Sequence, residues 1–94
     1  MSTSAEVPRI SPAAEWVVDR QGILVVGSAQ PRWLHGTEAA VWSWLSAGRS
    51  RAGLELLLAA YLAIEPPEAQ RSLGVILESW TDAGLLDCAG RVRG

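Results

Sequence analysis

The chain has 94 residues and a net charge of −2, with 49% hydrophobic and 19% charged residues. This length supports one domain with a single small core and excludes a second domain of ordinary size. No block of like charges marks a tail for nucleic acid. The longest apolar run, residues 56–64, is too short to span a membrane. Residues 1–15 lack the apolar segment of a secretory signal, so we expect a cytoplasmic protein that contacts no membrane.

A β-hairpin is expected near the start of the chain. Residues 15–20 and 23–27 are rich in β-branched and aromatic side chains. Gln21 and Gly22 separate the two runs and supply a turn signal, which is the pattern of two antiparallel strands joined by a tight loop. The sequence therefore predicts two neighbouring strands before any helix.

A third, shorter strand is expected at residues 32–35. Pro31 precedes it, which fits because proline is tolerated at the first position of a strand or on an edge. Residues 1–14 are small and polar and are expected to form a flexible arm. Within this arm, residues 7–10 are an alternative short edge strand.

Helices are expected over residues 38–46, 51–63 and 68–83. Thr37 is the expected N-cap of the first helix and Gly48 its C-terminal glycine, while Ser50 is the expected cap of the second. A pair of prolines at residues 66–67 marks the start of the third helix, because proline is well suited to the first turn of a helix.

Each expected helix carries an apolar face at helical spacing. The residues are Val41, Trp42 and Leu45; then Leu54, Leu57, Leu58, Tyr61 and Leu62; then Leu73, Ile76, Leu77 and Trp80. Strands followed by helices predict an α+β, winged-helix-like fold, in which a three-stranded antiparallel sheet precedes three helices. The domain is expected to span residues 15–87 and a tail residues 88–94.

The chain holds no set of residues that forms a catalytic or metal site. His35 is the only histidine and Cys88 the only cysteine, so there are too few ligands for structural zinc and there is no internal disulfide. Glu78 and Asp82 lie four residues apart on the third helix, where we expect solvated carboxylates. The chain is therefore predicted not to be an enzyme and to need no cofactor and no metal.

Three helices beside a hairpin also fit a winged-helix DNA-binding domain. From residue 65 to residue 87, however, the chain has five acidic residues and one basic residue, Arg71. The third helix would enter the DNA groove, and phosphate contacts need arginine or lysine. This charge argues against nucleic acid as a partner and leaves a winged-helix DNA-binding regulator as an alternative function.

The expected third strand offers a different kind of site, because it lies at an edge of the sheet. Unpaired backbone groups at such an edge can accept an extended peptide as an added strand. By alternation Arg32 and Leu34 share one face while Trp33 and His35 share the other, which leaves open whether Trp33 points outward or into the core. On the third helix, Val75 lies away from the apolar face and suits the wall of a shallow groove.

Several segments follow one another in a characteristic order. They are GILVV at 22–26, WLHGTEAAVWSWL at 33–45, AAY at 59–61, LGVIL at 73–77 and AGLLD at 83–87, with Gly48 between the first two helices. In this ordered set the chain resembles the PqqD-like family, the precursor-peptide recognition elements (RREs) of ribosomally synthesised and modified peptide (RiPP) biosynthesis. It departs from the family pattern at His35, where asparagine is common.

The resemblance implies a winged-helix-like fold and a non-catalytic peptide chaperone. Members of the family bind the leader of a precursor peptide as a strand beside their third strand, in a groove shared with the third helix. They present it to a modifying enzyme such as a radical-SAM maturase, a cyclase or a leader protease. Carried over by position, the peptide-binding residues would be Arg32, Trp33, Leu34, His35, Arg71, Val75, Glu78, Ser79 and Asp82.

Two further expectations concern this site. The substitution Leu34→Pro should remove an edge donor and abolish peptide binding while the helices stay folded. The acidic third helix suits a leader with basic residues. The remaining alternative is a structural or dimerisation domain, in which the exposed edge pairs with a second copy of the chain to form a homodimer.

Overall fold

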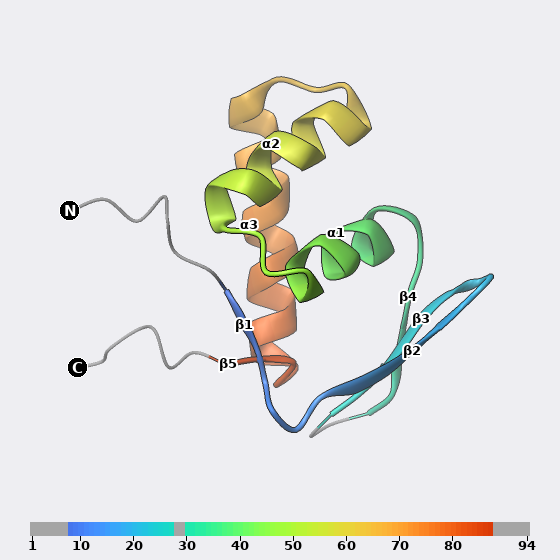
Figure 1. Cartoon of the computed structure of the whole chain (residues 1–94). Helices are drawn as coiled ribbons and strands as arrows, with labels where there is room; N and C mark the ends of the chain where they lie inside the picture. Colours follow the sequence, from blue (N-terminus) through green and yellow to red (C-terminus); the bar gives the residue numbers. More distant parts are fainter. Residues whose placement is uncertain (1–7, 28–29, 88–94) are drawn as a thin grey trace, which may run out of the picture.

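Strands precede helices along the chain, as the sequence predicts. The computed structural model of the protein describes residues 8–27 and 30–87. The elements in chain order are β1 (Arg9–Ile10), β2 (Glu15–Asp19), β3 (Gly22–Val26), β4 (Arg32–Leu34), α1 (Gly36–Ser46), α2 (Arg51–Leu62), α3 (Pro66–Asp82) and β5 (Leu86–Asp87). The helices gather on one side of the main sheet (Figure 1). The predicted α+β fold of three strands followed by three helices is confirmed.

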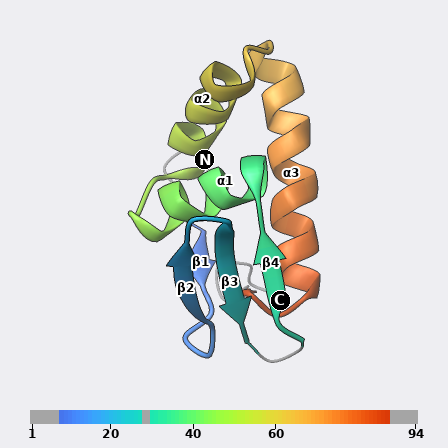
Figure 2. The same cartoon turned by 90° about the vertical axis from the view of Figure 1, so that its right-hand side faces the viewer.

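The main sheet is antiparallel, with β3 in the middle and β2 and β4 at its two edges. Arg20 and Gln21 join β2 to β3, which confirms the predicted hairpin. Across the sheet, Val17, Leu24 and Trp33 lie opposite one another in a single row. Figure 2 shows that β4 lies beside α3, whereas β2 lies on the far side of β3.

A second, two-stranded sheet joins the N-terminal segment to the chain that leaves α3. Ile10 of β1 lies opposite Leu86 of β5, and the Ser11 N–H donates to the Leu85 carbonyl oxygen at 2.9 Å. The alternative edge strand therefore forms, but against β5 and not against the main sheet. Within residues 8–14, the described part of the expected arm, the chain is hydrogen-bonded to the domain.

The first and third helices begin earlier than the sequence predicts. α1 has His35 at its N-cap position, and no side chain caps it. The expectation that Thr37 caps this helix is wrong, because Gly36 adopts a φ of 55° and turns the chain into the helix directly after β4. The His35 carbonyl oxygen then accepts the Glu38 N–H at 3.1 Å. α3 likewise begins earlier than expected, at Pro66.

The other helix ends lie within one residue of their predicted positions. The Ser50 hydroxyl accepts the Gly53 N–H at 3.1 Å at the start of α2. Gly48 follows the end of α1 with a φ of 87°, a left-handed conformation that glycine adopts without strain. Beyond α3, the Leu85 N–H returns to the Trp80 carbonyl oxygen at 2.9 Å, which closes the helix and sends the chain into β5.

The core lies between the inner face of the sheet and the helices. Trp42 and Trp80 are fully buried, and their rings meet edge to face with centroids 5.1 Å apart. Trp16 of β2 adds a third ring, 5.4 Å from Trp42. The predicted apolar faces of α1 and α3 are buried, except that Ile76 is only half-buried.

The predicted apolar face of α2 is only partly right. Leu54 and Leu58 are fully buried, but Tyr61 and Leu62 are exposed. Tyr61 packs edge to face against Trp44 of α1, with ring centroids 5.8 Å apart. The rest of the Tyr61 side chain and the exposed part of Leu62 face solvent. Helical spacing alone did not reveal that the described part of the fold leaves this end of α2 uncovered.

None of the helices in the described ranges has the length and apolarity needed to cross a membrane. The expected tail, residues 88–94, lies outside the described residues, and so does Cys88. The expected domain boundaries at residues 15 and 87 stay a prediction.

Candidate functional site

The outer edge of β4 carries free backbone groups. A Cβ atom added at Gly22 would overlap the Leu34 carbonyl oxygen, so this oxygen points toward β3. Leu34 lies opposite Ile23, and the two residues exchange the hydrogen bonds of the β3–β4 ladder. Successive residues of a strand point their N–H and C=O groups to opposite sides. The N–H and C=O groups of Trp33 therefore point away from β3, and no strand of the described chain lies on that side.

The side chains of β4 divide between the two faces of the sheet. Leu34 is fully buried in the core and Arg32 lies on the same inner face, half-buried. Trp33 is 45% exposed, so it points outward, which resolves the orientation that the sequence left open. The Trp33 ring stacks on the His35 ring with centroids 6.1 Å apart, and His35 Nδ1 lies 2.9 Å from the Gln21 carbonyl oxygen.

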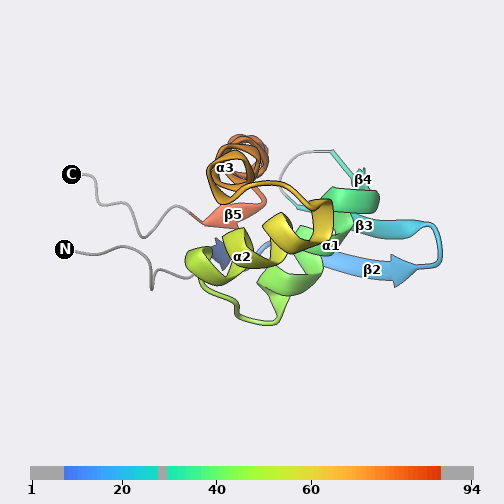
Figure 3. The same ribbon diagram turned by 90° about the horizontal axis from the view of Figure 1, so that it is seen from above.

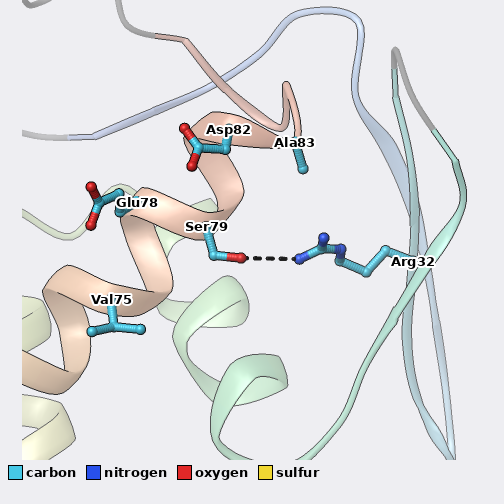
Figure 4. A pocket seen from close by; sticks show the side chains of 6 residues that line it. All are labelled: Arg32, Val75, Glu78, Ser79, Asp82 and Ala83. Atoms are coloured by element: carbon cyan, nitrogen blue, oxygen red, sulfur yellow. Dashed lines mark hydrogen bonds between the residues drawn. The ribbon is translucent and has the colours of Figure 1, made fainter.

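The space between β4 and α3 is a groove with a volume of 460 Å³. We call it the β4–α3 groove; its lining residues are Arg32, Val75, Glu78, Ser79, Asp82 and Ala83. Arg32 reaches across from β4, and its Nη1 donates to the Ser79 hydroxyl at 3.4 Å (Figure 4). Four of the other side chains come from the C-terminal half of α3, and Ala83 is the residue that caps the end of this helix.

A second depression continues the β4–α3 groove along the strand. It has a volume of 390 Å³, shares Arg32 and Ala83 with the first, and is also lined by Gln30, Pro31 and Leu85. Sequence reasoning missed these last three residues and Ala83. Of these four residues, only Ala83 carries a signal in the sequence. A small residue at the end of a helix allows a neighbouring chain to pass close to it.

Five of the nine residues that the sequence proposed for peptide binding line the β4–α3 groove: Arg32, Val75, Glu78, Ser79 and Asp82. Trp33 and His35 flank the edge on the outer face, and Leu34 supports it from within the core. Arg71 does not reach the groove. Together with Arg51 it lines an adjoining depression of 720 Å³ on the other flank of α3, which shares Val75, Glu78 and Asp82 with the groove.

Two of the acidic residues of α3 lie on the rim of the groove. Glu78 and Asp82 line both the β4–α3 groove and the depression that holds Arg71. With the described residues, neither carboxylate makes a hydrogen bond or an ion pair. The ion pair found within residues 8–27 and 30–87 is between Arg51 and Glu55, at 3.5 Å.

The groove offers hydrogen-bonding and packing surfaces. Across the described ranges, no group of three or more histidine, cysteine, aspartate or glutamate side chains is placed to hold a metal ion. What the site supplies is an unpaired strand edge, an exposed valine, a hydroxyl and two carboxylates. These groups suit an extended chain whose backbone pairs with β4 and whose alternate side chains rest on α3.

The expectation for Leu34→Pro is wrong in its reasoning. The Leu34 backbone pairs with β3 and its side chain is fully buried, so proline at this position would damage the core and the inner ladder. The residue whose N–H faces the open edge is Trp33. A test of strand addition has to be made there.

The chain thus folds as a small α+β domain with an open strand edge beside a groove walled by a helix. The structure is similar to that of TbiB1 in complex with the TbiA(beta) leader peptide, with a TM-score of 0.80 and 18% identity over 90% of this chain and 99% of that one. It is also similar to a lasso peptide synthetase B1 complexed with the leader peptide, with a TM-score of 0.77 and 20% identity over 86% and 98% of the two chains. The chain therefore has the fold of these two proteins over nearly their whole length.

No protein-family model matches the sequence, and no curated protein matches it. The fold expected from the resemblance is confirmed by the two structural matches.

Proposed function

We propose that the protein is a non-catalytic recognition domain that binds the leader of a ribosomal precursor peptide. The observation that carries the proposal is the unpaired edge of β4 beside the β4–α3 groove. The fold supports it, because both solved structures with this fold that are described above were determined with a leader peptide bound. The biological setting would be RiPP biosynthesis in the cytoplasm.

In the proposed complex, the leader adds a fourth strand to the main sheet. Its backbone pairs with the N–H and C=O groups of Trp33, and its inward side chains rest on Val75, Ser79 and Ala83. Leu34 contributes by holding β4 in register, and the Trp33 and His35 rings border the outward side chains. Arg32 meets the leader at the groove floor. Arg71, on the other flank of α3, is at most a contact for residues beyond the added strand.

A modest affinity is sufficient for such a domain. A dissociation constant of about 1 μM corresponds to about −8 kcal/mol. Backbone pairing and one or two apolar anchors supply this after the costs of association and of ordering the peptide. The bound precursor would then be presented to a modifying enzyme of the kinds named above: a radical-SAM maturase, a cyclase or a leader protease.

The direct test is calorimetric titration of the domain with synthetic leaders from short reading frames beside its gene. The proposal predicts one-to-one binding near 1 μM, which a scrambled leader of the same composition does not reproduce. Absence of binding by every such leader would contradict the proposal. Binding of duplex DNA in the same experiment would favour the winged-helix regulator, and dimerisation in sedimentation without peptide would favour the dimerisation domain.

A further inference from the structure

The C-terminal turn of α3 carries charges that are unfavourable for the helix itself. Glu78 and Asp82 are four residues apart, and like charges at this spacing repel each other across one turn. Both lie near the C-terminus, where the partial negative charge of the helix dipole disfavours carboxylates. The last turn of α3 contains no basic residue to offset them. The free domain therefore maintains two carboxylates where helix physics favours neutral or basic side chains.

The basic residues nearby compensate this arrangement only in part. The guanidinium group of Arg32, which lines the same groove, donates to Ser79, and Arg51 pairs with Glu55. Arg71 shares a depression with both carboxylates, but in the described structure it forms no ion pair with either of them. Within the described chain, Glu78 and Asp82 make no hydrogen bond and no ion pair. Two unpaired carboxylates at an unfavourable position are what a site for a cation requires before its ligand arrives.

The geometry of the groove fixes the kind of cation that fits. Figure 4 shows the Ser79 side chain directed toward Arg32, while the carboxylates of Glu78 and Asp82 point away from β4. Val75, 68% exposed, lies one turn before Glu78. A side chain that starts from a strand beside β4 can run along Val75 before it reaches the carboxylates. A long aliphatic stem with a charged end, as in arginine or lysine, has this shape.

We propose that Glu78 and Asp82 bind an arginine or lysine side chain of the leader, whose stem packs on Val75. The inference rests on the proposed function and makes it specific: the recognised leader carries a basic residue among the inward-facing positions of the added strand. The charge complementarity also speeds association at low salt, because the rim attracts a cationic peptide.

The test uses the double substitution Glu78→Gln with Asp82→Asn in the full chain. Neutralising these residues should raise the thermal midpoint of the free domain and weaken binding of the encoded synthetic leader by about three- to tenfold at low salt. A leader in which the responsible arginine or lysine is replaced by glutamine should bind the original domain as weakly as the encoded leader binds the double variant. It should lose little further affinity for the double variant, since the two changes remove the same interaction.

The control is Glu65→Gln with Glu68→Gln, which changes the net charge equally at the other end of α3. These carboxylates lie at the positive end of the helix dipole and line none of the depressions described above, so their loss should lower the thermal midpoint and leave leader affinity within about twofold. Equal affinity of the original domain and the first double variant would overturn the cation site but leave leader binding intact. If both double variants weaken leader binding equally, the change in net charge alone explains the loss, and the proposed site is overturned. Failure of every encoded leader to bind would overturn the site together with the proposed function.

Discussion

The two edges of the main sheet have the same backbone chemistry and different surroundings. β2 is the longer edge strand, and every one of its five residues is exposed, with Val17 and Val18 at 64% and 70%. β4 has only three residues, but it runs beside α3 and shares a groove with it. Figure 3, which looks down on the molecule, shows the β2–β3 hairpin reaching out from the helices.

A free strand edge is therefore not by itself a binding site. An added strand on either edge gains backbone hydrogen bonds, and each contributes only about 0.5–1.5 kcal/mol net. At β4 the added strand also buries side chains against α3, whereas at β2 it would have no helix on its open side in the described structure. Charged residues at the ends of β2, Glu15 and Asp19, are typical of edges that are kept from pairing.

The largest effect is expected from Trp33→Pro. Proline removes the N–H that faces the open edge, and we expect leader affinity to fall about tenfold or more below that of Trp33→Ala, which removes the ring but keeps the N–H. Calorimetry with both variants separates the contribution of the backbone N–H from that of the side chain.

The control lies at the other edge of the sheet. The two-residue loop makes Asp19 and Gly22 a hydrogen-bonded pair, so alternation directs the Val18 N–H to the open edge of β2. Val18→Pro should leave leader affinity unchanged, and equal losses at both edges would refute the distinction between them.

Gly22→Ala tests whether the β4 edge depends on close packing against β3. The added Cβ would overlap the Leu34 carbonyl oxygen and approach His35 Nδ1 to 3.0 Å. We expect a loss of about 1–3 kcal/mol in the free energy of unfolding, with β4 shifted out of register. Gly53→Ala is the matched control. Its nearest neighbour, the Ser50 hydroxyl oxygen, is 3.5 Å away, so alanine should stabilise α2 by about 0.5–1 kcal/mol. Chemical denaturation that gives the same sign for both substitutions would contradict this view of Gly22.

Val75→Glu tests the wall of the groove. Val75 is 68% exposed in the free domain, so the substitution should leave the free energy of unfolding nearly unchanged. Leader affinity should fall about three- to tenfold, because the lost valine contact outweighs the attraction of an added carboxylate for a cationic leader. Leu56→Glu on α2 is the control, since Leu56 is 69% exposed and lies outside the groove. A leader affinity that falls equally in the two variants would show that surface charge, and not the wall, is responsible.

The smallest effect is expected from Ser79→Ala. The hydrogen bond from Arg32 to Ser79 is 3.4 Å long and exposed, so its loss should change the free energy of unfolding by less than about 0.5 kcal/mol. Denaturation and leader titration should both give values close to those of the original domain. A large loss of stability would mean that this bridge, and not the core, holds α3 against the sheet.

Sequence patterns predicted most of this fold because its signals are local. The hairpin has a turn between two β-branched runs, and Ser50 and Gly48 mark helix ends by backbone chemistry that does not depend on the rest of the chain. Predictions failed where a distant contact decides. Tyr61 has the spacing of a core residue, yet the fold leaves it at the surface. The pairing of β1 with β5 joins the two ends of the described chain, which no periodicity can indicate.

The same distinction holds for the candidate site. Alternation along β4 correctly grouped Arg32 with Leu34, and helical spacing correctly left Val75 exposed. It could not give the direction in which Trp33 points, because that depends on which face of the sheet the helices cover. Arg71 was assigned to the groove from its position on α3 alone, but the rotation of the helix directs it to the opposite flank.

Amide hydrogen exchange, measured with and without a saturating leader peptide, reports directly whether the leader pairs with β4. If the leader pairs with β4, the Trp33 amide should exchange at least about tenfold more slowly in the complex, since it gains a backbone acceptor that the free edge lacks. The Val18 amide on the open edge of β2 should keep its rate. Saturable leader binding that leaves the Trp33 amide unprotected, or that protects Val18 instead, would contradict strand addition at β4.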